Sequence, residues 1–411
     1  MRPIFVVAVL AGGASLAAAQ GTDGLEPLAG TGRAEFTAVA QTGGQARALG
    51  RALERIRLPD GFRIALYAVA PGARGIAVSP DGTVVFVGTR GDTVWSIADR
   101  DGDGVADDVR DFAPAIDKTM PNGPCFGPDG SLYVPELNRI VVYPDAAAAR
   151  DAPAPPAFAV VRQGALIPPE EEASVHGARV CRVGPDGGLY ISLGQPYNVP
   201  PKSKLALYDA WGIGGIVRMD ADGTGRRVYA SGIRNSVGMD FNPANGELWF
   251  TDNQVDRMGD DIPPGEINRV TAPGQNFGFP WYGGGTVRTP QYEAEEIPEG
   301  VVDPAVEMTA HAADLGMTFY AGGAFPRKYH GGIFNAQHGS WNRSTPVGAR
   351  VMFTAVNPDG SAGETEVFAE GWLTPDGEYI GRPVDVAVLP DGSLLVSDDR
   401  AGAVYRISYG G

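Results

Sequence analysis

One segment of the chain combines residue types that suit an anionic ligand and a cation. Residues 232–270 read GIRNSVGMDFNPANGELWFTDNQVDRMGDDIPPGEINRV, and Arg234 and Asn235 open a short predicted strand. A polar loop, DNQVD at 252–256, follows the next predicted strand. A guanidinium pairs with carboxylates, whereas amide, carboxylate and carbonyl oxygens are ligands for calcium. The segment predicts an anion site beside a hard cation, although many acidic loops are only solvated.

Two further polar residues occupy similar places in the sequence. His176 and Arg382 are expected to begin other inner strands, each of which runs into a glycine-containing turn. An imidazole, with an ordinary pKa of ~6.5, can act as a base, and a guanidinium fork binds carboxylates in a bidentate manner. A structural hydrogen bond or a surface ion pair would explain each residue equally well. If the strands surround one axis, these residues and Arg234 converge on one mouth of a central channel.

The elements that must position these residues are repeated hairpins. A proline, a short turn with glycine and an alternating apolar strand recur in SPDGTVVFV (79–87), GPDGSLYVP (127–135), GPDGGLYIS (184–192), NPANGELWF (242–250) and LPDGSLLVS (389–397). A less regular sixth unit spans 316–356. The spacing of about 50 to 60 residues suits four-stranded propeller blades. The sequence therefore predicts an all-β protein, a six-bladed β-propeller.

The segment before the first repeat predicts how the ring closes. Residues 58–69, LPDGFRIALYAV, have no blade of their own, so we expect them to pair near 402–407 as the outer strand of the last blade. Residues 20–57 contain a Gly- and Thr-rich linker and then a short amphipathic helix. Residues 58–411 are expected to form the propeller domain.

The N-terminal residues have the composition of an export signal. Residues 1–19 combine an arginine, an apolar run and the small residues of a cleavage site. The apolar run is shorter than the ~20 residues that span a bilayer, and no other run is long enough. The sequence therefore predicts a protein without a membrane span, located in the periplasm or secreted.

Charge and cysteine content exclude several functions. The formal net charge of −16 disfavours nucleic acid binding and suits either a solubilising surface or docking of a basic partner. Cys125 and Cys181 can bridge or stay buried, and we expect two buried thiols. No CxxCH motif is present, which excludes a covalent c-type haem. The loop DRDGDGVADD (99–108) resembles half a calcium loop, and we expect an acidic hairpin between outer strands.

The chain resembles the soluble quinoprotein glucose/sorbosone dehydrogenases, six-bladed propellers that carry pyrroloquinoline quinone (PQQ) and calcium. The resemblance runs from residue 58 to the end and is closer to the sorbosone dehydrogenase branch. It rests on the His176 strand and on GIRNSVGMDFNP through PPGEIN, GQNFGFPWYGG, QHGSWNRSTPVG and GRPVDVAVLPDG. Each hairpin alone is common among propellers, whereas the whole set is specific.

The resemblance implies a role for each matched residue. His176 is the general base that takes the proton from a sugar hydroxyl. Arg234 and Asn235 flank the reactive carbonyl of the cofactor, and Asn253 contacts the cofactor through its amide. Arg382 contacts a carboxylate of the cofactor.

Two further segments match the family less directly. The backbone carbonyls of Gln254 and Val255 fall where calcium is ligated. Trp341, Asn342 and Arg343 fall roughly where a cofactor-contacting lysine would be, with an insertion in this chain.

The chain departs from the glucose-oxidising branch at two positions. Gln195 stands where a carboxylate supports the histidine, so the pKa of His176 is expected near or below ~6.5. Val384 stands where the family has a second arginine. Both differences put glucose as the substrate in doubt.

The resemblance implies an enzyme that oxidises a sugar, an aldose or a sugar aldehyde by hydride transfer to PQQ. Electrons are then expected to pass to an external acceptor, such as a cationic cytochrome. The alternatives are a calcium-dependent propeller lactonase and a non-catalytic binding propeller, since a fold does not fix function.

Overall fold

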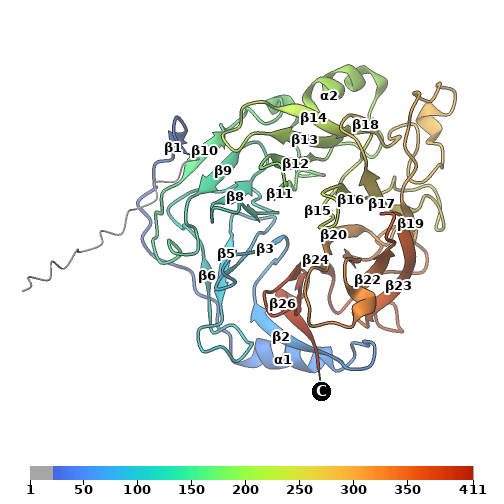
Figure 1. The fold of residues 1–411 in the computed structure, drawn as a ribbon. Coiled ribbons are helices and arrows are strands. Elements are labelled where there is room, and N and C mark those ends of the chain that lie inside the picture. The colour runs from blue at the N-terminus through green and yellow to red at the C-terminus, as the bar shows by residue number, and fades with distance from the viewer. Residues whose placement is uncertain (1–21, 411) are drawn as a thin grey trace, which may run out of the picture.

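The computed structural model describes residues 22–410, which form six sheets around a central axis (Figure 1). The six-bladed propeller predicted from the hairpin repeats is confirmed. The export signal expected at 1–19 lies outside the described residues. No helix within 22–410 is long and apolar enough to cross a membrane.

Within each of the first five blades, the four strands follow one another in sequence order from the axis outward. Blades 1 to 3 consist of β3 (Ile76–Val78), β4 (Val85–Val87), β5 (Trp95–Ala98) and β6 (Asp108–Asp111); β7 (Cys125–Phe126), β8 (Leu132–Pro135), β9 (Ile140–Tyr143) and β10 (Phe158–Val161); and β11 (Cys181–Val183), β12 (Leu189–Leu193), β13 (Gly215–Met219) and β14 (Arg227–Ser231). Two short strands extend these sheets, β1 (Glu26–Pro27) beside β10 and β18 (Gln275–Asn276) beside β14.

The remaining blades follow the same order, and the last begins and ends with different parts of the chain. Blades 4 to 6 consist of β15 (Met239–Phe241), β16 (Leu248–Asp252), β17 (Gly265–Val270) and β19 (Val306–Met308); β20 (Asp314–Phe319), β21 (Ile333–Gln337), β22 (Arg350–Val356) and β23 (Ala362–Glu370); and β24 (Pro383–Val388), β25 (Leu394–Asp398), β26 (Ala403–Tyr409) and β2 (Phe62–Val69).

The glycine of each regular hairpin turn explains why the repeat is visible in the sequence. These glycines have φ between 72° and 83°, a left-handed conformation that residues with a Cβ rarely adopt; they are Gly82, Gly130, Gly187, Gly246 and Gly392. The alternating residues after each turn enter strands whose apolar side chains are buried between blades.

The closing strand lies where the sequence placed it. β2 pairs antiparallel with β26 from Phe62 opposite Tyr409 to Val69 opposite Ala403. This pairing completes blade 6 and closes the ring.

The two cysteines do not remain free, so the expectation of buried thiols was wrong. Cys125 on β7 and Cys181 on β11 form a disulfide, with their Cα atoms 5.6 Å apart. The two residues occupy corresponding places on neighbouring inner strands, a relation visible in the sequence. The distance between the strands, which lies in the range that disulfides bridge, is set by blade packing.

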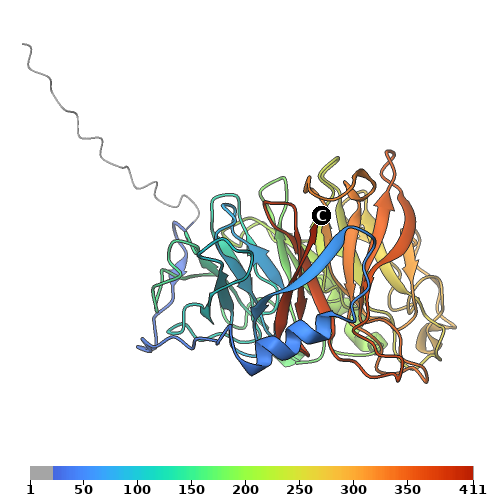
Figure 2. The ribbon, with the colours of Figure 1, turned by 90° about the horizontal axis from the view of Figure 1, so that it is seen from below.

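The inner strands of all six blades begin at one face of the propeller, and we call their common end of the channel the mouth. Helix α1 (Gly44–Leu53), the short helix expected before residue 58, lies at the side of the disc toward this face, and β26 ends near the other face (Figure 2). Helix α2 (Leu205–Trp211) belongs to a mouth loop of blade 3.

Candidate functional site

The polar residues singled out in the sequence lie before inner strands at the mouth. Arg382 directly precedes β24, whereas Arg234 and Asn235 lie five and four residues before β15 and do not begin that strand, contrary to expectation. His176 does not begin its strand, contrary to expectation, but lies in a turn five residues before β11 with a φ of 52°. The chain between them forms a bridge from Val180 to Gly123 of blade 2 before regular pairing begins.

His176 is held as a neutral base. Its Nδ1 lies 2.6 Å from the backbone oxygen of Gln195. A carbonyl oxygen can only accept, so Nδ1 carries the proton and Nε2 is the basic atom. Burial and the Arg234 guanidinium lower the pKa of His176 to about 3. The expected low pKa is therefore confirmed in direction.

The support for His176 comes from the backbone and not from a side chain. The Gln195 amide bonds with the backbone of Tyr197 instead, accepting from its N–H at 2.9 Å and donating to its carbonyl. Buried Arg179 donates to the backbone oxygens of His176 at 3.1 Å and Gly194 at 3.0 Å. The turn and the imidazole are thus fixed without a carboxylate next to the ring.

Arg234 and Asn235 are fixed by the strand beside them. Asp252 accepts both of their backbone N–H groups, at 2.8 Å and 2.7 Å. The Arg234 side chain is buried and donates to Asn198 and to Asp256, the latter at 2.9 Å. Its charge is therefore compensated, and its remaining N–H on Nη1 is available to a ligand.

His176 and Asn235 meet at one point of the mouth. Gly194 separates them so closely that a Cβ on this residue would lie 2.5 Å from Asn235 Oδ1 and 2.9 Å from His176 Cβ. Asn235 Oδ1 is buried and accepts no hydrogen bond from any described residue. An unsatisfied buried acceptor beside a base fits a bound group that donates to it.

The loop expected to bind calcium has the required free oxygens. The backbone carbonyl oxygens of Gln254 and Val255 accept no hydrogen bond from described residues, although both residues are buried. Gln254 Nε2 donates to His311 Nδ1 at 3.1 Å, because His311 Nε2 donates to backbone carbonyls. Free carbonyl oxygens fit a hard cation.

Asn253 joins this loop to the arginine pair. Its amide donates to the backbone oxygens of Asn235 at 3.1 Å and Asp314 at 3.2 Å. Its side-chain oxygen has no partner among the described residues and remains available.

Arg382 precedes the inner strand of blade 6, two blades beyond this loop. Its Nε donates to His338 O at 2.9 Å and its Nη2 to Gly339 O at 2.5 Å. The guanidinium lies over the Tyr379 ring, 4.8 Å from the centroid. Only Nη1 lacks a partner among the described residues, which leaves one end of the fork for an anion.

The three residues that fall where the family has a lysine, 341–343, have different surroundings. Asn342 donates to Asp256 at 3.3 Å and is thereby brought to Arg234. Arg343 bonds instead to the loop at 260–261, including Asp261 at 3.1 Å. Trp341 is 64% exposed, and the Arg257 guanidinium lies 5.9 Å from its ring centroid.

A second polar network at the mouth was not predicted from the sequence. Asp399 accepts from His338 Nε2 at 2.8 Å and from Arg74 at 2.5 Å. Arg74 also donates to Asn122 at 2.6 Å. Arg74 and Asn122 precede the inner strands of blades 1 and 2, as Arg382 does in blade 6. Alignment of all six repeats could have found them.

Val384 stands at the position where the resemblance implied a second arginine. Its side chain is buried in the apolar core between blades and packs in the same cluster as Val180 and Leu315. The position therefore serves packing rather than ligand binding.

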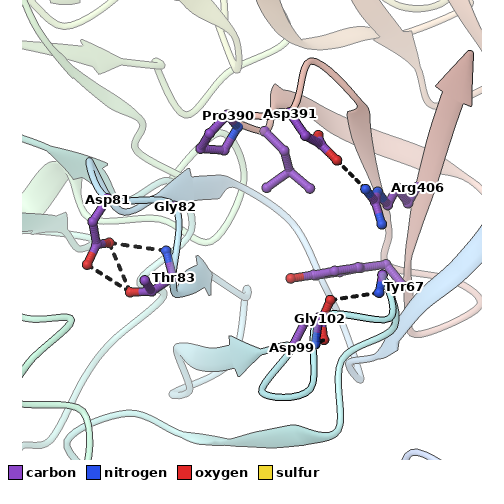
Figure 3. A pocket seen from close by; sticks show the side chains of 11 residues that line it. Tyr67, Asp81, Gly82, Thr83, Asp99, Gly102, Pro390, Asp391 and Arg406 are labelled. Carbon is purple, nitrogen blue, oxygen red and sulfur yellow. Dashed lines mark hydrogen bonds and ion pairs between the residues drawn. The ribbon is translucent and has the colours of Figure 1, made fainter. Parts of the chain in front are cut away.

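A separate pocket of about 410 Å³ lies between blades 1 and 6, at the hairpin-turn side of the disc (Figure 3). The ring of Tyr67 extends across it, and Arg406 pairs with Asp391 (Figure 3). Asp99 accepts the N–H groups of Gly102 and Gly104, each at 2.8 Å. The 99–108 loop joins the two outer strands of blade 1, as expected, and lies away from the mouth.

Comparison with a family model identifies the class of protein that this chain is similar to. Residues 163–406 match the model described as glucose/sorbosone dehydrogenase. This range contains all the site residues predicted from the sequence, from His176 to Arg382.

Two curated proteins extend the similarity. A protein of Borreliella burgdorferi, described as uncharacterized, is 29% identical over 363 residues, which cover 86% of this chain and 91% of that protein. An aldose sugar dehydrogenase of Escherichia coli is 27% identical over 247 residues, which cover 54% of this chain and 57% of that protein.

Solved structures share the fold at low identity. The holo form of the PQQ domain of pyranose dehydrogenase from Coprinopsis cinerea has a TM-score of 0.67 at 18% identity, covering 86% of this chain and 97% of that chain. The apo form of the soluble aldose sugar dehydrogenase from Escherichia coli has a TM-score of 0.58 at 20% identity, covering 85% and 100%.

Proposed function

The chain belongs to the glucose/sorbosone dehydrogenase family, and from this premise we propose that it is an exported quinoprotein that oxidises a sugar, an aldose or a sugar aldehyde. Family membership makes it a sugar dehydrogenase, rather than the lactonase or the binding propeller considered from the sequence. Binding of PQQ and calcium by this chain, the sorbosone-type substrate and the external acceptor are the proposed parts.

The observation that carries the proposal is a fixed neutral imidazole beside an unsatisfied amide at the mouth. His176 presents a basic Nε2 because its Nδ1–H is bonded to Gln195 O. Asn235 Oδ1, close to His176 on the other side of Gly194, has no partner among the described residues. A sugar hydroxyl that reached Nε2 would give its proton to the imidazole as the carbon-bound hydrogen leaves with its electron pair.

The groups at the mouth fit the cofactor and the cation. Arg382, Asn235, Asn253 and the free N–H of Arg234 would hold the cofactor, and Asn342 orients Asp256 behind Arg234. The carbonyls of Gln254 and Val255 would hold the calcium. When bound, PQQ supplies an electrophilic carbonyl that accepts the hydride, and calcium polarises that carbonyl.

Two features support export. Residues 1–19 read as a signal peptide, and the Cys125–Cys181 disulfide is typical of oxidising compartments. Sequencing the N-terminus of the protein from the periplasmic fraction of the producing cell would test this directly. An intact Met1 there would contradict cleavage near residue 19.

The activity is tested with protein reconstituted with PQQ and calcium. Aldoses, including glucose, and L-sorbosone are offered with the dye dichlorophenolindophenol as acceptor. We expect dye reduction that requires both PQQ and calcium and that favours a substrate other than glucose. PQQ binding without oxidation of any sugar or aldehyde would refute the proposal.

A further inference from the structure

Four exposed apolar side chains follow the rim of the mouth. They are exposed to 54%, 37%, 46% and 64%, and we call them the apolar arc: Val175, Tyr197, Ile262 and Trp341. They come from loops of blades 3, 4 and 5, far apart in the sequence. Exposed apolar residues gathered at one place mark an interaction site more often than scattered ones.

The first part of the arc is joined through the histidine turn. Val175 immediately precedes His176, whose ring bonds to the backbone of Gln195. The Gln195 side chain bonds to both backbone groups of Tyr197. Val175 and Tyr197 therefore both lie close to the proposed base.

The second part is joined through Asp256. Asn198, next to Tyr197, accepts the Asp256 N–H at 2.9 Å, and Asn342, next to Trp341, donates to the Asp256 carboxylate at 3.3 Å. The Asp256 carboxylate also binds Arg234. Tyr197 and Trp341 therefore border the side chains that surround Arg234.

The arc ends at the 260–262 loop. Arg343, two residues after Trp341, pairs with Asp261 at 3.1 Å. Ile262 follows Asp261, and its backbone oxygen accepts from His311 at 3.0 Å. The arc thus borders the proposed cofactor residues through an unbroken series of contacts.

Carboxylates surround the arc. Segments 170–176, 256–262 and 293–303 contain eleven acidic residues. Four of them form ion pairs, buried Glu171 with Lys204, Asp256 with Arg234, Asp261 with Arg343 and Glu295 with Lys202, which leaves seven without a described basic partner. The one arginine in these segments, Arg257, lies 5.9 Å from the Trp341 ring centroid. Segment 293–303 contacts the Tyr197 loop, because Glu295 pairs with Lys202. Arg90 is a further cation at the mouth and donates to Ser174 O at 2.9 Å.

We propose that the apolar arc and its carboxylates dock a small cationic protein that carries one electron. This inference rests on the proposed function, in which sugar oxidation supplies two electrons. Two carrier molecules accept one electron each, and the two protons lost by the sugar pass to solvent. An apolar patch gives a short-lived contact over the cofactor residues, and the carboxylates steer a cationic carrier toward it.

The test compares a cationic carrier with a dye. The probes are mitochondrial cytochrome c, which is cationic, and dichlorophenolindophenol, each with sugar-reduced holoprotein. Glu170→Lys/Glu296→Lys reverses two exposed charges without described partners, and Tyr197→Ser/Ile262→Ser removes part of the arc. Glu364→Lys and Val367→Ser, on exposed positions of β23 in blade 5, are the matched controls.

We expect the second-order rate constant with cytochrome c to fall at least tenfold in both site variants, with dye rates within twofold of wild type. The salt dependence with cytochrome c should weaken in the charge variant. Unchanged cytochrome rates in both variants would overturn the proposal, as would an arc that only forms a homodimer by light scattering. Failure of every variant and wild type to reduce the dye would refute the proposed function instead.

Discussion

At the scale of single residues, the structure makes His176 a base whose protonation state does not change near neutral pH. The lack of a carboxylate neighbour predicted a pKa near or below ~6.5 for His176, and burial beside Arg234 lowers this pKa to about 3. We expect His176→Gln to retain PQQ binding and to lower the rate of sugar oxidation by ~10²-fold or more, the usual effect of losing a positioned base. Single-turnover reduction of the holoprotein measures this. A variant as fast as wild type would make His176 structural.

The same residue links stability to pH. The unfolded imidazole binds a proton below ~6.5, whereas the native one stays neutral down to about 3. The unfolded state therefore binds more protons in this window, and native stability falls as pH falls through it. We expect the wild type to lose more stability than His176→Gln between pH 7 and pH 5, measured by urea unfolding. An equal loss in both proteins would contradict the low pKa.

Arg382 is expected to act on cofactor affinity rather than on turnover. Its free Nη1 would pair with a remote carboxylate of the cofactor, so the loss should be uniform in ground and transition states. Removing a charge-assisted bond costs about 1.5–3 kcal/mol. We expect Arg382→Ala to weaken PQQ binding by roughly 10- to 100-fold in a fluorescence titration, with turnover at saturating PQQ nearly retained. Arg382→Lys, which lacks the fork, is the matched control.

At the scale of elements, the start of β20 contains a buried acid that no sequence pattern predicts. Burial raises the pKa of Asp314 to about 7. Asp314 Oδ1 accepts from Asn335 at 2.8 Å and from Gln337 at 2.9 Å, whereas Oδ2 has no partner among the described residues. Gly265 makes room for this carboxyl, since a Cβ there would lie 2.4 Å from Oδ2.

The Asp314 carboxyl predicts a stabilising substitution. The native state binds this proton more tightly than the unfolded chain, so its stabilising contribution is lost as pH rises through about 7. Asp314→Asn keeps the acceptor for Asn335 and Gln337 and removes the titration. We expect the variant to gain stability over wild type between pH 5 and pH 9 in urea unfolding. A constant difference across this range would contradict the raised pKa.

The periodic parts of the blades could be predicted from the sequence, and the contacts between blades could not. The repeated turns with proline and glycine predict the order of the strands, because each turn is formed by residues adjacent in the sequence. The strand before the first repeat predicts how the ring closes. The support of His176 by Gln195 O leaves no trace in residue type, because any residue has a backbone carbonyl. The disulfide and the Arg74–Asp399–His338 network depend on distances between blades that only packing determines.

At the scale of the whole molecule, the disulfide ties the inner strands of blades 2 and 3, whose cysteines are 56 residues apart. Closing a loop of this size restricts the unfolded chain and stabilises the native state by about 4 kcal/mol in the chain-entropy account. We expect Cys125→Ala/Cys181→Ala to fold but to unfold at lower urea concentration by an equivalent of about 2–4 kcal/mol. Reductant should shift the wild type and leave the variant unchanged. A variant as stable as oxidised wild type would contradict this role.

Because β2 closes the ring, the same propeller could be built with the chain ends placed in another blade. The ends of the propeller already touch, since Gly410 N–H donates to Gly61 O at 3.2 Å. A circular permutant that joined these two residues and opened in the 144–157 loop would close its ring with β10 in place of β2. Three residue pairs of β10 with β9 would then replace the seven of β2 with β26 as the seam. The native seam lies where the longest overlap of strands holds the two ends of one circular architecture together.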